Sequence, residues 1–355
     1  MIYNQHRKYI NTTTLVQLVY LTMFKRIGID LGTSFTRVAV EDKGIIISEP
    51  TVVAISTKDK KVLAIGLEAK NMLGKVPSGI EARRPIRQGV IASYKLTEEI
   101  LNGLLSRSLG RFRLFRPEVV ISIPAGITSV EERAIIEAMV QAGAGKVYLL
   151  PEPVAAAIGA GMPIGSSAGN MIVNIGGGTS EIAIISMNGI VNFASKRIGG
   201  DTINDSIVTH LRKRFGIVIG EQMAEKIKLQ IGSATLMDSP LEIEVRGRDT
   251  TSGMPVSIKL TSNDVLEPIK QVLNQIIVSI KKVLEITPPE LSSDIIDRGM
   301  VLSGGMALLR NIDDLFTKAT GVAAHVVEDP ENTVINGILA TLNNLDEYRR
   351  TLKDY

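Results

Sequence analysis

Short apolar runs bounded by glycine or charged residues predict strands in two separate parts of the chain. Near the N-terminus, the apolar run Arg26–Gly32 ends at a glycine, and the alternating run Arg37–Glu41 follows it. In the middle of the chain, the apolar halves of Met171–Ser186 flank three consecutive glycines. Both stretches therefore predict strand, tight turn and strand. Because more short strands follow the first pair, the pattern favours an antiparallel or mixed sheet.

Apolar residues at helical spacing predict helices between these strands. Thr128-x-x-Glu131 fits a capping box, and Asp264–Ile286 is the longest amphipathic segment. The predicted helices are Leu67–Leu73, Thr97–Leu109, 128–143, Val154–Gly161, one capped by Asp201, Glu221–Gly232, Asp264–Ile286, Met306–Thr320, and a C-terminal helix or helix pair over Thr333–Lys353. Further strands are predicted at Pro117–Ile123, Lys146–Leu150, Gly189–Lys196 and Gly299–Ser303. The alternation indicates an α/β protein.

The two glycine-rich turns share one arrangement of residues. Ile27–Thr36 and Ile172–Ser180 each run from an apolar strand through Asp or Asn to glycine and then to hydroxyl side chains. Glycines leave backbone N–H groups unshielded, and such amides bind phosphate oxygens. Each turn taken alone also fits a hairpin without a ligand. Their repetition predicts two similar domains whose turns face one another across a cleft.

A third loop, Ser303–Met306, joins a strand to a helix, and a helix N-terminus favours an anion. The chain contains neither a Walker A motif nor GxGxxG opening a helix. These absences argue against a P-loop NTPase and against a dinucleotide-binding domain.

Composition narrows the choice of function. The 355 residues suffice for two domains with full cores, and the net charge of +3 argues against nucleic acid as a partner. Cysteine is absent, which excludes disulfides and fits a reducing cytoplasm. The three histidines lack metal-ligand spacing, which argues against a zinc site.

The first 22 residues differ from the rest of the chain. Their apolar run, Leu15–Phe24, is too short to span a bilayer, and no small-residue cleavage site follows it. The segment is either a membrane-surface anchor or an incidental extension before a true start at Met23. The second interpretation is favoured.

The sequence predicts two facing hairpins, a third Gly-Gly loop and an interdomain cleft. This combination resembles the pattern found in the superfamily of actin, sugar kinases and DnaK-type chaperones. Within it, the chain resembles the MreB family of bacterial actin homologues, from Met23 to about Leu345. The segments that carry the resemblance are Asp30–Thr33, Lys43–Ile45, Glu49–Ala54, Gly66–Met72, Arg84-Pro85, Gly89–Ala92, Gly126–Thr128, Val130–Ala134, Glu152-Pro153, Ala155–Gly159, Thr287–Leu291 and Asp294-Ile295.

The resemblance implies an actin-like ATPase fold, with two duplicated domains around a nucleotide cleft and a smaller inserted subdomain in each. The implied division is an N-terminal extension at 1–22, domain I at 23–165 with an inserted lobe at about 57–87 and a C-terminal return at 333–355, and domain II at 166–332 with an inserted lobe at about 200–260.

The resemblance also implies a site for ATP or ADP with Mg²⁺. The implied nucleotide-binding residues are Thr33, Ser34 and Phe35 in the first turn, Gly176, Gly177, Gly178 and Thr179 in the second, Glu225, Lys226, Ile227 and Lys228 at the ribose and adenine, and Gly304, Gly305 and Met306 beneath the adenine. Glu152 is the implied catalytic glutamate, and Thr179 is implied to assist it. Asp30 is the implied carboxylate that holds Mg²⁺ through water.

Three residues depart from the family pattern. Asn174 replaces a second aspartate near the metal, Phe35 replaces an asparagine, and Pro151 replaces an acidic residue. An amide loses the charge, so we expect weaker positioning of Mg²⁺ and weak ATP hydrolysis. Without the family resemblance, Glu152 would also fit the role of a helix cap. Glu225 and Lys228 would also fit an ordinary surface ion pair.

The family assembles into filaments that guide cell-wall synthesis and cell shape, which implies self-assembly here. Leu114 and Phe115, among arginines, match a loop that inserts into the inner leaflet, although a loop folded onto the core fits the same residues. The implied location is the cytoplasmic face of the membrane, with membrane-bound morphogenesis proteins as partners. Alternatives are a plasmid-partitioning actin, a small-molecule kinase and a chaperone ATPase.

Overall fold

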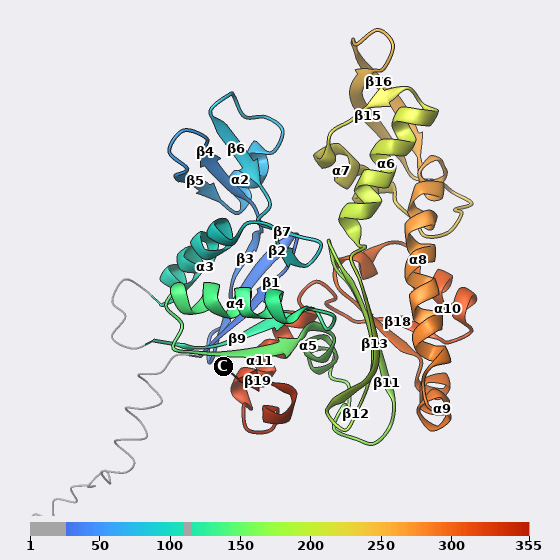
Figure 1. The fold of residues 1–355 in the computed structure, drawn as a ribbon. Coiled ribbons are helices and arrows are strands. Elements are labelled where there is room, and N and C mark those ends of the chain that lie inside the picture. Colours follow the sequence, from blue (N-terminus) through green and yellow to red (C-terminus); the bar gives the residue numbers. More distant parts are fainter. Residues whose placement is uncertain (1–25, 110–115, 355) are drawn as a thin grey trace, which may run out of the picture.

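The computed structural model describes residues 26–109 and 116–354, which form two large sheets with helices around and between them (Figure 1). The first sheet has the order β19-β10-β9-β1-β2-β3. Its strands are β1 (Arg26–Leu31), β2 (Phe35–Val40), β3 (Gly44–Pro50), β9 (Glu118–Ile123), β10 (Lys146–Pro151) and β19 (Lys353–Asp354). The pairs β1–β2 and β2–β3 are antiparallel and β1–β9 and β9–β10 parallel, which confirms the predicted mixed sheet.

The second sheet repeats this plan in the order β13-β12-β11-β17-β18. Its strands are β11 (Asn170–Ile175), β12 (Ser180–Ser186), β13 (Gly189–Lys196), β17 (Met300–Ser303) and β18 (Ala324–Val326). The meander β11-β12-β13 is antiparallel, whereas β17 and β18 continue the sheet in parallel. The turn after the first strand of each meander is therefore one of the two glycine-rich turns.

Two helices lie between the large sheets, and the others lie on the outer faces or in the smaller lobes (Figure 1). The helices beside the first sheet are α3 (Tyr94–Leu109), α4 (Ser129–Gln141), α5 (Glu152–Gly159) and α11 (Thr333–Asn343). A buried cluster joins α5 and α11 to strands of both sheets, through Val120 and Tyr148 on one side and Ile172 and Ala183 on the other. These two helices thus form the apolar centre of the molecule.

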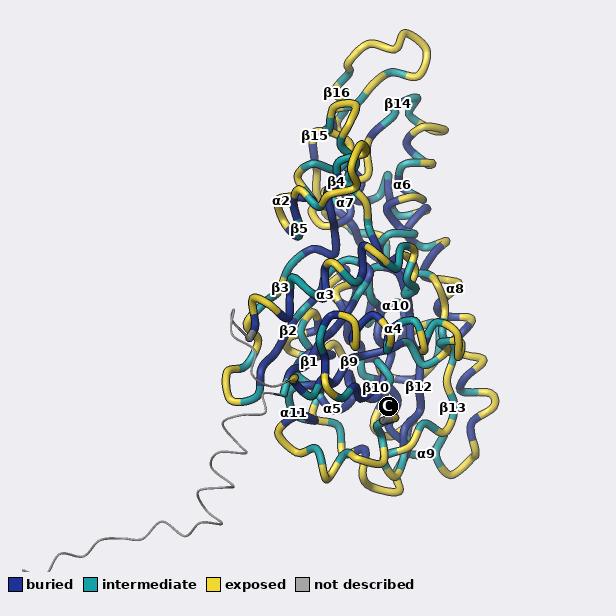
Figure 2. Tube along the Cα trace, turned by 60° about the vertical axis from the view of Figure 1, so that its left-hand side comes forward, coloured by how far each residue is buried: buried dark blue, intermediate teal, exposed yellow. Residues whose placement is uncertain are grey.

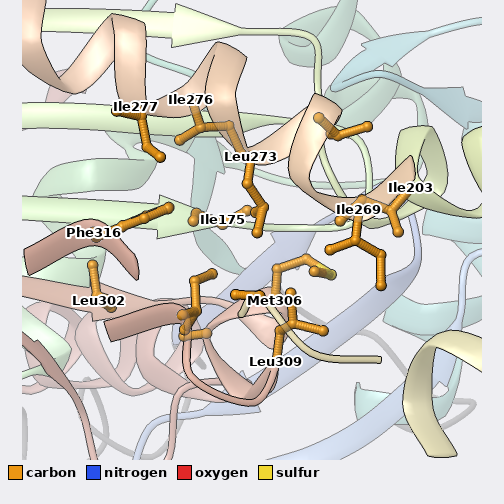
Figure 3. Packing of buried hydrophobic residues seen from close by; sticks show 14 of the residues in the cluster. Ile175, Ile203, Ile269, Leu273, Ile276, Ile277, Leu302, Met306, Leu309 and Phe316 are labelled. Atoms are coloured by element: carbon orange, nitrogen blue, oxygen red, sulfur yellow. The ribbon is translucent and has the colours of Figure 1, made fainter. Parts of the chain in front are cut away.

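The second half contains the largest core. Its helices are α6 (Gly200–Arg214), α7 (Glu221–Ile231), α8 (Leu266–Glu285), α9 (Pro289–Arg298) and α10 (Ile312–Thr320). Figure 3 shows Ile269, Leu273 and Ile276 of α8 directed into a cluster with Ile175 and Phe316. The 3.6-residue period of α8 produces this apolar face, as predicted.

Two smaller lobes stand at the same end of the molecule (Figure 1). The first has the sheet β5-β4-β6, made of β4 (Val53–Ser56), β5 (Val62–Ile65) and β6 (Ile80–Arg83), with α2 (Leu67–Met72). The second has β14 (Ile217–Val218), β15 (Glu242–Asp249) and β16 (Pro255–Thr261) beside α6 and α7. The short strands β7 (Ile86–Arg87) and β8 (Val90–Ile91) pair with each other between the first lobe and α3. In Figure 2 the lobe tips are largely exposed, whereas the central strands of the large sheets are buried.

Helices α5 and α11 approach each other at two glycines. A Cβ atom on Gly159 would lie 2.7 Å from the backbone nitrogen of Gly337, and one on Gly337 would lie 2.9 Å from the backbone nitrogen of Gly159. Real Cβ atoms do not come this close to backbone atoms. Both positions therefore require glycine for close helix packing.

Several predicted boundaries were wrong. The segment predicted as one helix from Met306 is a short 3-10 helix, η2 (Gly305–Leu308), separated from α10 by Asn311, whose left-handed φ of 59° breaks the helix. Asp201 lies inside α6, since the N-cap residue is Gly199. The C-terminal helix ends at Asn343, and the chain continues through 3-10 helix η3 (Arg349–Thr351) to β19, which pairs with β10. A further 3-10 helix, η1 (Ser262–Asp264), precedes α8.

None of the helices within residues 26–109 and 116–354 combines the length and the apolar character needed to cross a bilayer.

Candidate functional site

A cavity lies where the two glycine-rich turns meet. Its lining includes most of the predicted nucleotide-site residues, namely Asp30, Thr33, Ser34, Phe35, Glu152, Asn174, Gly176, Gly177, Gly178, Thr179, Glu225, Lys228, Gly304, Gly305 and Met306. The structure therefore brings together residues from β1, β2, α5, β11, α7 and η2 that are far apart in the sequence.

The first turn is held by one hydrogen bond within its own hairpin and by two from residues outside it. The Gly32 N–H donates to the Phe35 carbonyl (3.1 Å), and the Thr51 hydroxyl donates to the Gly32 carbonyl (2.7 Å). The Thr33 hydroxyl oxygen accepts from the Gly89 N–H (3.0 Å). The turn is thus fixed before any ligand binds.

The second turn is held both by its hairpin and by the start of α6. The Gly176 N–H donates to the Thr179 carbonyl (2.8 Å), and the Gly200 N–H donates to the Gly176 carbonyl (3.0 Å). A Cβ atom on Gly177 would lie 2.8 Å from Ser34 Cβ, so the two turns touch across the cavity. Glycine is required here because any larger residue would push the turns apart.

Two polar groups sit at the ends of the central strands. Asp30 Oδ1 accepts from the Ser122 hydroxyl (3.1 Å), and Asn174 Oδ1 accepts from the Ser303 hydroxyl (3.1 Å). Burial raises the pKa of Asp30, while Arg37 and Ser122 act in the opposite direction. Among the described residues, no cluster of three or more potential metal-ligating side chains occurs.

Glu152 is the first residue of α5 and lines the cavity. Burial raises its pKa well above the ordinary value, and the charges of Glu181 and Asp30 add to the effect. This environment disfavours the charged carboxylate, which is the form that a general base requires.

Sequence reasoning missed Glu181, a fully buried carboxylate on β12. Its oxygens accept from the Ser195 hydroxyl (2.6 Å) and from the Ala125 N–H (3.1 Å), which ties β12 to the loop after β9. Burial raises the pKa of Glu181 to about 7, although the hydrogen bonds from these two donors act to lower it. A glutamate inside the apolar run SEIAIIS was the signal that could have revealed it.

Helix α7 turns only part of its predicted set towards the cavity. Glu225 and Lys228 line it, and the Lys228 ammonium donates to the Gly200 carbonyl (3.0 Å). Burial lowers the pKa of Lys228. Lys226 is exposed and Ile227 is fully buried in the core, so neither lines the cavity. The helical period carries these two residues away from the face that bears Glu225.

The two lobes are joined beside the cavity by contacts that we call the lobe bridge, comprising Lys70, Arg84, Glu221, Gln222 and Glu225. The Lys70 ammonium pairs with the Glu225 carboxylate (3.0 Å), and Arg84 Nη2 pairs with Glu221 (2.9 Å). The Gln222 amide donates to the Lys70 carbonyl (2.9 Å). Glu225 thus belongs both to the lobe bridge and to the cavity wall.

The third loop closes the cavity from below. Gly304 has a left-handed φ of 83°, and its N–H donates to the Pro330 carbonyl (2.8 Å). The cavity also has lining residues that sequence reasoning missed, namely Leu31, Gly32, Arg37, Gly89, Gly200, Leu229, Pro330, Glu331 and Val334. Of these, Arg37 stood out in the sequence as a charge within an otherwise apolar strand.

The predicted membrane residues Leu114 and Phe115 and the N-terminal extension 1–22 lie outside the described residues.

Comparison with known proteins gives the family. A model of the MreB/Mbl protein family matches residues 24–350. The cell shape-determining protein MreB of Haemophilus influenzae is 47% identical over 327 residues, which cover 90% of this chain and 93% of that protein. The cell shape-determining protein Mbl of Bacillus subtilis is 43% identical over 326 residues, with coverage of 92% and 98%.

Solved structures show the fold. MreB5 of Spiroplasma citri bound to ADP superposes with a TM-score of 0.88 at 31% identity, covering 92% of this chain and 98% of that one. The MamK double helical filament has a TM-score of 0.74 at 20% identity, covering 91% and 98%. The predicted actin-like α/β fold is confirmed, and the chain belongs to the MreB/Mbl family.

Proposed function

We propose that this protein binds ATP and ADP in the cavity between the two glycine-rich turns and assembles into cytoskeletal filaments that determine cell shape. The observation that carries the proposal is the contact of the two turns across the cavity, where Gly177 faces Ser34. It is supported by relatives named cell shape-determining proteins and by MreB5 of Spiroplasma citri, which was solved with ADP and with AMPPNP.

The cavity residues divide by chemistry into two ends. Backbone amides of Thr33, Ser34 and Gly177–Thr179 suit the phosphates, because successive N–H groups form an anion-binding concavity. Glu225 and Lys228 suit the ribose and adenine, and Gly304–Met306 provide a flat floor without a bulky side chain at its start. The same division places Glu152 near the terminal phosphate.

Hydrolysis is proposed to be slow. Glu152 is the proposed residue that orients the attacking water, with Thr179 assisting. Burial raises the pKa of Glu152 and so disfavours the charged form that would remove a proton from that water. Weak turnover follows from this chain's own residues.

Magnesium is the proposed counterion of the phosphates, with Asp30 reaching it through water. The residues present fit this ion weakly. Mg²⁺ in nucleotide sites is usually held by one or two carboxylates together with phosphates. Here the Asp30 carboxylate already faces Arg37 at 3.6 Å, and Asn174 is uncharged, with its Oδ1 accepting from Ser303.

The proposed moving parts are two domains, residues 23–165 with the return 333–355, and residues 166–332. Nucleotide binding would hold the two touching turns in contact and strengthen the lobe bridge, since Glu225 belongs both to the lobe bridge and to the cavity wall. A change in the angle between the domains would alter the surfaces through which copies of the chain assemble head to tail. An open head-to-tail contact produces a filament rather than a closed ring.

The membrane proposal rests on sequence alone. Leu114 and Phe115 lie among three arginines, each of which would contribute about 1 kcal/mol towards an anionic surface. We therefore place the filament on the cytoplasmic face of the membrane, beside membrane-bound morphogenesis proteins. The double variant Leu114→Ser with Phe115→Ser should lose flotation with anionic liposomes. Equal flotation of both proteins would refute this contact.

Sedimentation tests the main proposal. Purified protein at micromolar concentration should pellet with ATP and remain largely soluble without nucleotide. A protein that stays monomeric under all nucleotide conditions but phosphorylates a small acceptor would instead be a kinase of the same fold.

A further inference from the structure

An arginine projects into the phosphate end of the cavity. Arg37 on β2 is the cross-strand partner of Asp30 on β1, so the two side chains share one face of the sheet. Arg37 Nη1 lies 3.6 Å from Asp30 Oδ2, and both residues line the cavity. The side chains are 11% and 10% exposed, so the pair is well shielded from water.

The guanidinium is fixed from several sides. Arg37 Nε donates to Asn332 Oδ1 (3.0 Å), and the Asn332 amide in turn donates to Asp329 (2.9 Å). The guanidinium carbon lies 5.3 Å from the centre of the Phe35 ring, within range of a cation–π contact. Within the described part of the chain, Nη2 has no hydrogen-bond partner. The charge is therefore held in place with donors left to offer to a ligand.

Arg37 already supplies a positive charge at this end of the cavity, and the charges there favour binding of an anion over binding of a metal cation. Asp30 is paired with Arg37, and Asn174 is neutral. Glu152 and the buried Glu181 repel each other, so the two cannot both carry full charge at low cost. A divalent cation beside Asp30 would lie close to the positive charge of Arg37, which would oppose its binding.

We propose that Arg37 is a phosphate-binding residue of this cavity and that it supplies part of the positive charge that Mg²⁺ would otherwise supply. The inference rests on the proposed nucleotide function and adds to it. A guanidinium presents several N–H donors in a rigid fork that matches phosphate oxygens. Nucleotide binding should therefore depend only weakly on Mg²⁺.

Calorimetric titration with ADP tests this directly, once with excess EDTA and once with Mg²⁺. Wild-type protein should bind ADP in both buffers. Arg37→Leu should raise the Kd of ADP in EDTA by roughly 10- to 100-fold, the range expected for a lost charge-assisted hydrogen bond. With Mg²⁺ the loss should be smaller, because Asp30 is then free to hold the hydrated ion.

Two further variants separate the role of the charge from its structural role. Arg37→Gln keeps a hydrogen-bond donor but no charge, and it should bind metal-free ADP as poorly as Arg37→Leu. Arg37→Lys keeps the charge and should recover part of the affinity. Arg26→Leu is the matched control, since Arg26 lies in the same sheet and pairs with Glu41 and Glu118 but does not line the cavity. It should leave both Kd values unchanged.

Each result has a definite meaning. If folded Arg37→Leu and Arg37→Gln bind metal-free ADP as tightly as wild type, the proposal is wrong. It is equally wrong if they lose the same factor with and without Mg²⁺. If Arg37→Leu does not fold, Arg37→Gln against Arg37→Lys decides in the same way. Wild-type protein that binds no ADP in either buffer would overturn the proposed nucleotide function as well, whereas binding that requires Mg²⁺ would overturn only the role of Arg37.

Discussion

Replacing Gly337 with alanine should force apart two helices that carry cavity residues. Helix α5 begins with Glu152, and α11 contains Val334, which also lines the cavity. A Cβ atom on Gly337 would lie 2.7 Å from the carbonyl carbon of Ala155 and 2.9 Å from the Gly159 nitrogen. Backbone atoms cannot rotate away as a side chain can. The helices must therefore separate.

The size of the effect follows from two opposing contributions. Overpacking a well-packed core costs about 1–3 kcal/mol, and the backbone contact places this case at the upper end. Replacing a helical glycine with alanine stabilises the helix by about 1 kcal/mol, because alanine has the higher helix propensity. The net destabilisation should be about 2 kcal/mol, which for a chain of 355 residues lowers Tm by roughly 3 °C, because the unfolding entropy is about 2.1 cal/mol/K per residue.

Differential scanning calorimetry of the nucleotide-free protein measures the shift. Gly103→Ala in α3 is the matched control, because a Cβ atom there meets only Ile65 Cδ1, at an ordinary 3.6 Å. That substitution should raise Tm, since it gains helix propensity without a clash. If Gly337→Ala raises Tm to the same extent, the α5–α11 contact is not the constraint inferred from the geometry. ADP affinity should also fall in Gly337→Ala, because Glu152 and Val334 move apart.

Three other perturbations test separate parts of the site. Lys70→Ala should speed ADP dissociation two- to fivefold, since the partly exposed pair with Glu225 contributes about 0.5–1 kcal/mol. Stopped-flow release should show no change in the surface control Lys61→Ala. Burial raises the pKa of Glu181 from 4.5 to about 7, so the native state binds its proton more tightly than the unfolded chain does. Its contribution to stability is therefore full below pH 4.5 and is lost as the pH rises through 7. Glu181→Gln cannot ionise, so urea unfolding should show the variant gaining stability relative to wild type over that range; a difference independent of pH would contradict this. Asn174→Asp should speed phosphate release from ATP in the presence of Mg²⁺ by restoring a carboxylate, and an unchanged rate would show that Asn174 does not limit hydrolysis.

Features that depend on short-range sequence could be predicted well. The glycine turns, the capping box at Thr128 and the apolar face of α8 are local consequences of residue type and spacing, and the structure confirms them. Most of the cavity residues could be named because the family motifs fix their order along the chain. Their meeting in one cavity follows from the repeated strand-turn-strand unit.

Features that depend on partners far away in the sequence could not be predicted from it. Strand β19 forms only because the edge of β10 is free to pair with it, and nothing in its own residues favours a strand over a helix. Arg37 lines the cavity because its strand register sets it opposite Asp30. Lys226 does not line the cavity because the phase of α7 turns its side chain outward. Register and helix phase are set by tertiary packing, which a local pattern does not contain.

The contacts between the two halves differ in kind at the two ends of the cavity. At one end, α5 and α11 pack together in an apolar cluster with strands of both large sheets. At the other, the lobe bridge consists of ion pairs and hydrogen bonds that water can replace. In the domain motion proposed above, this cluster would be the pivot and the lobes would move farthest from it. A slight shift of the phosphate turns, which lie close to the pivot, would then become a larger displacement at the lobe tips, where a neighbouring subunit of the proposed filament would respond to it.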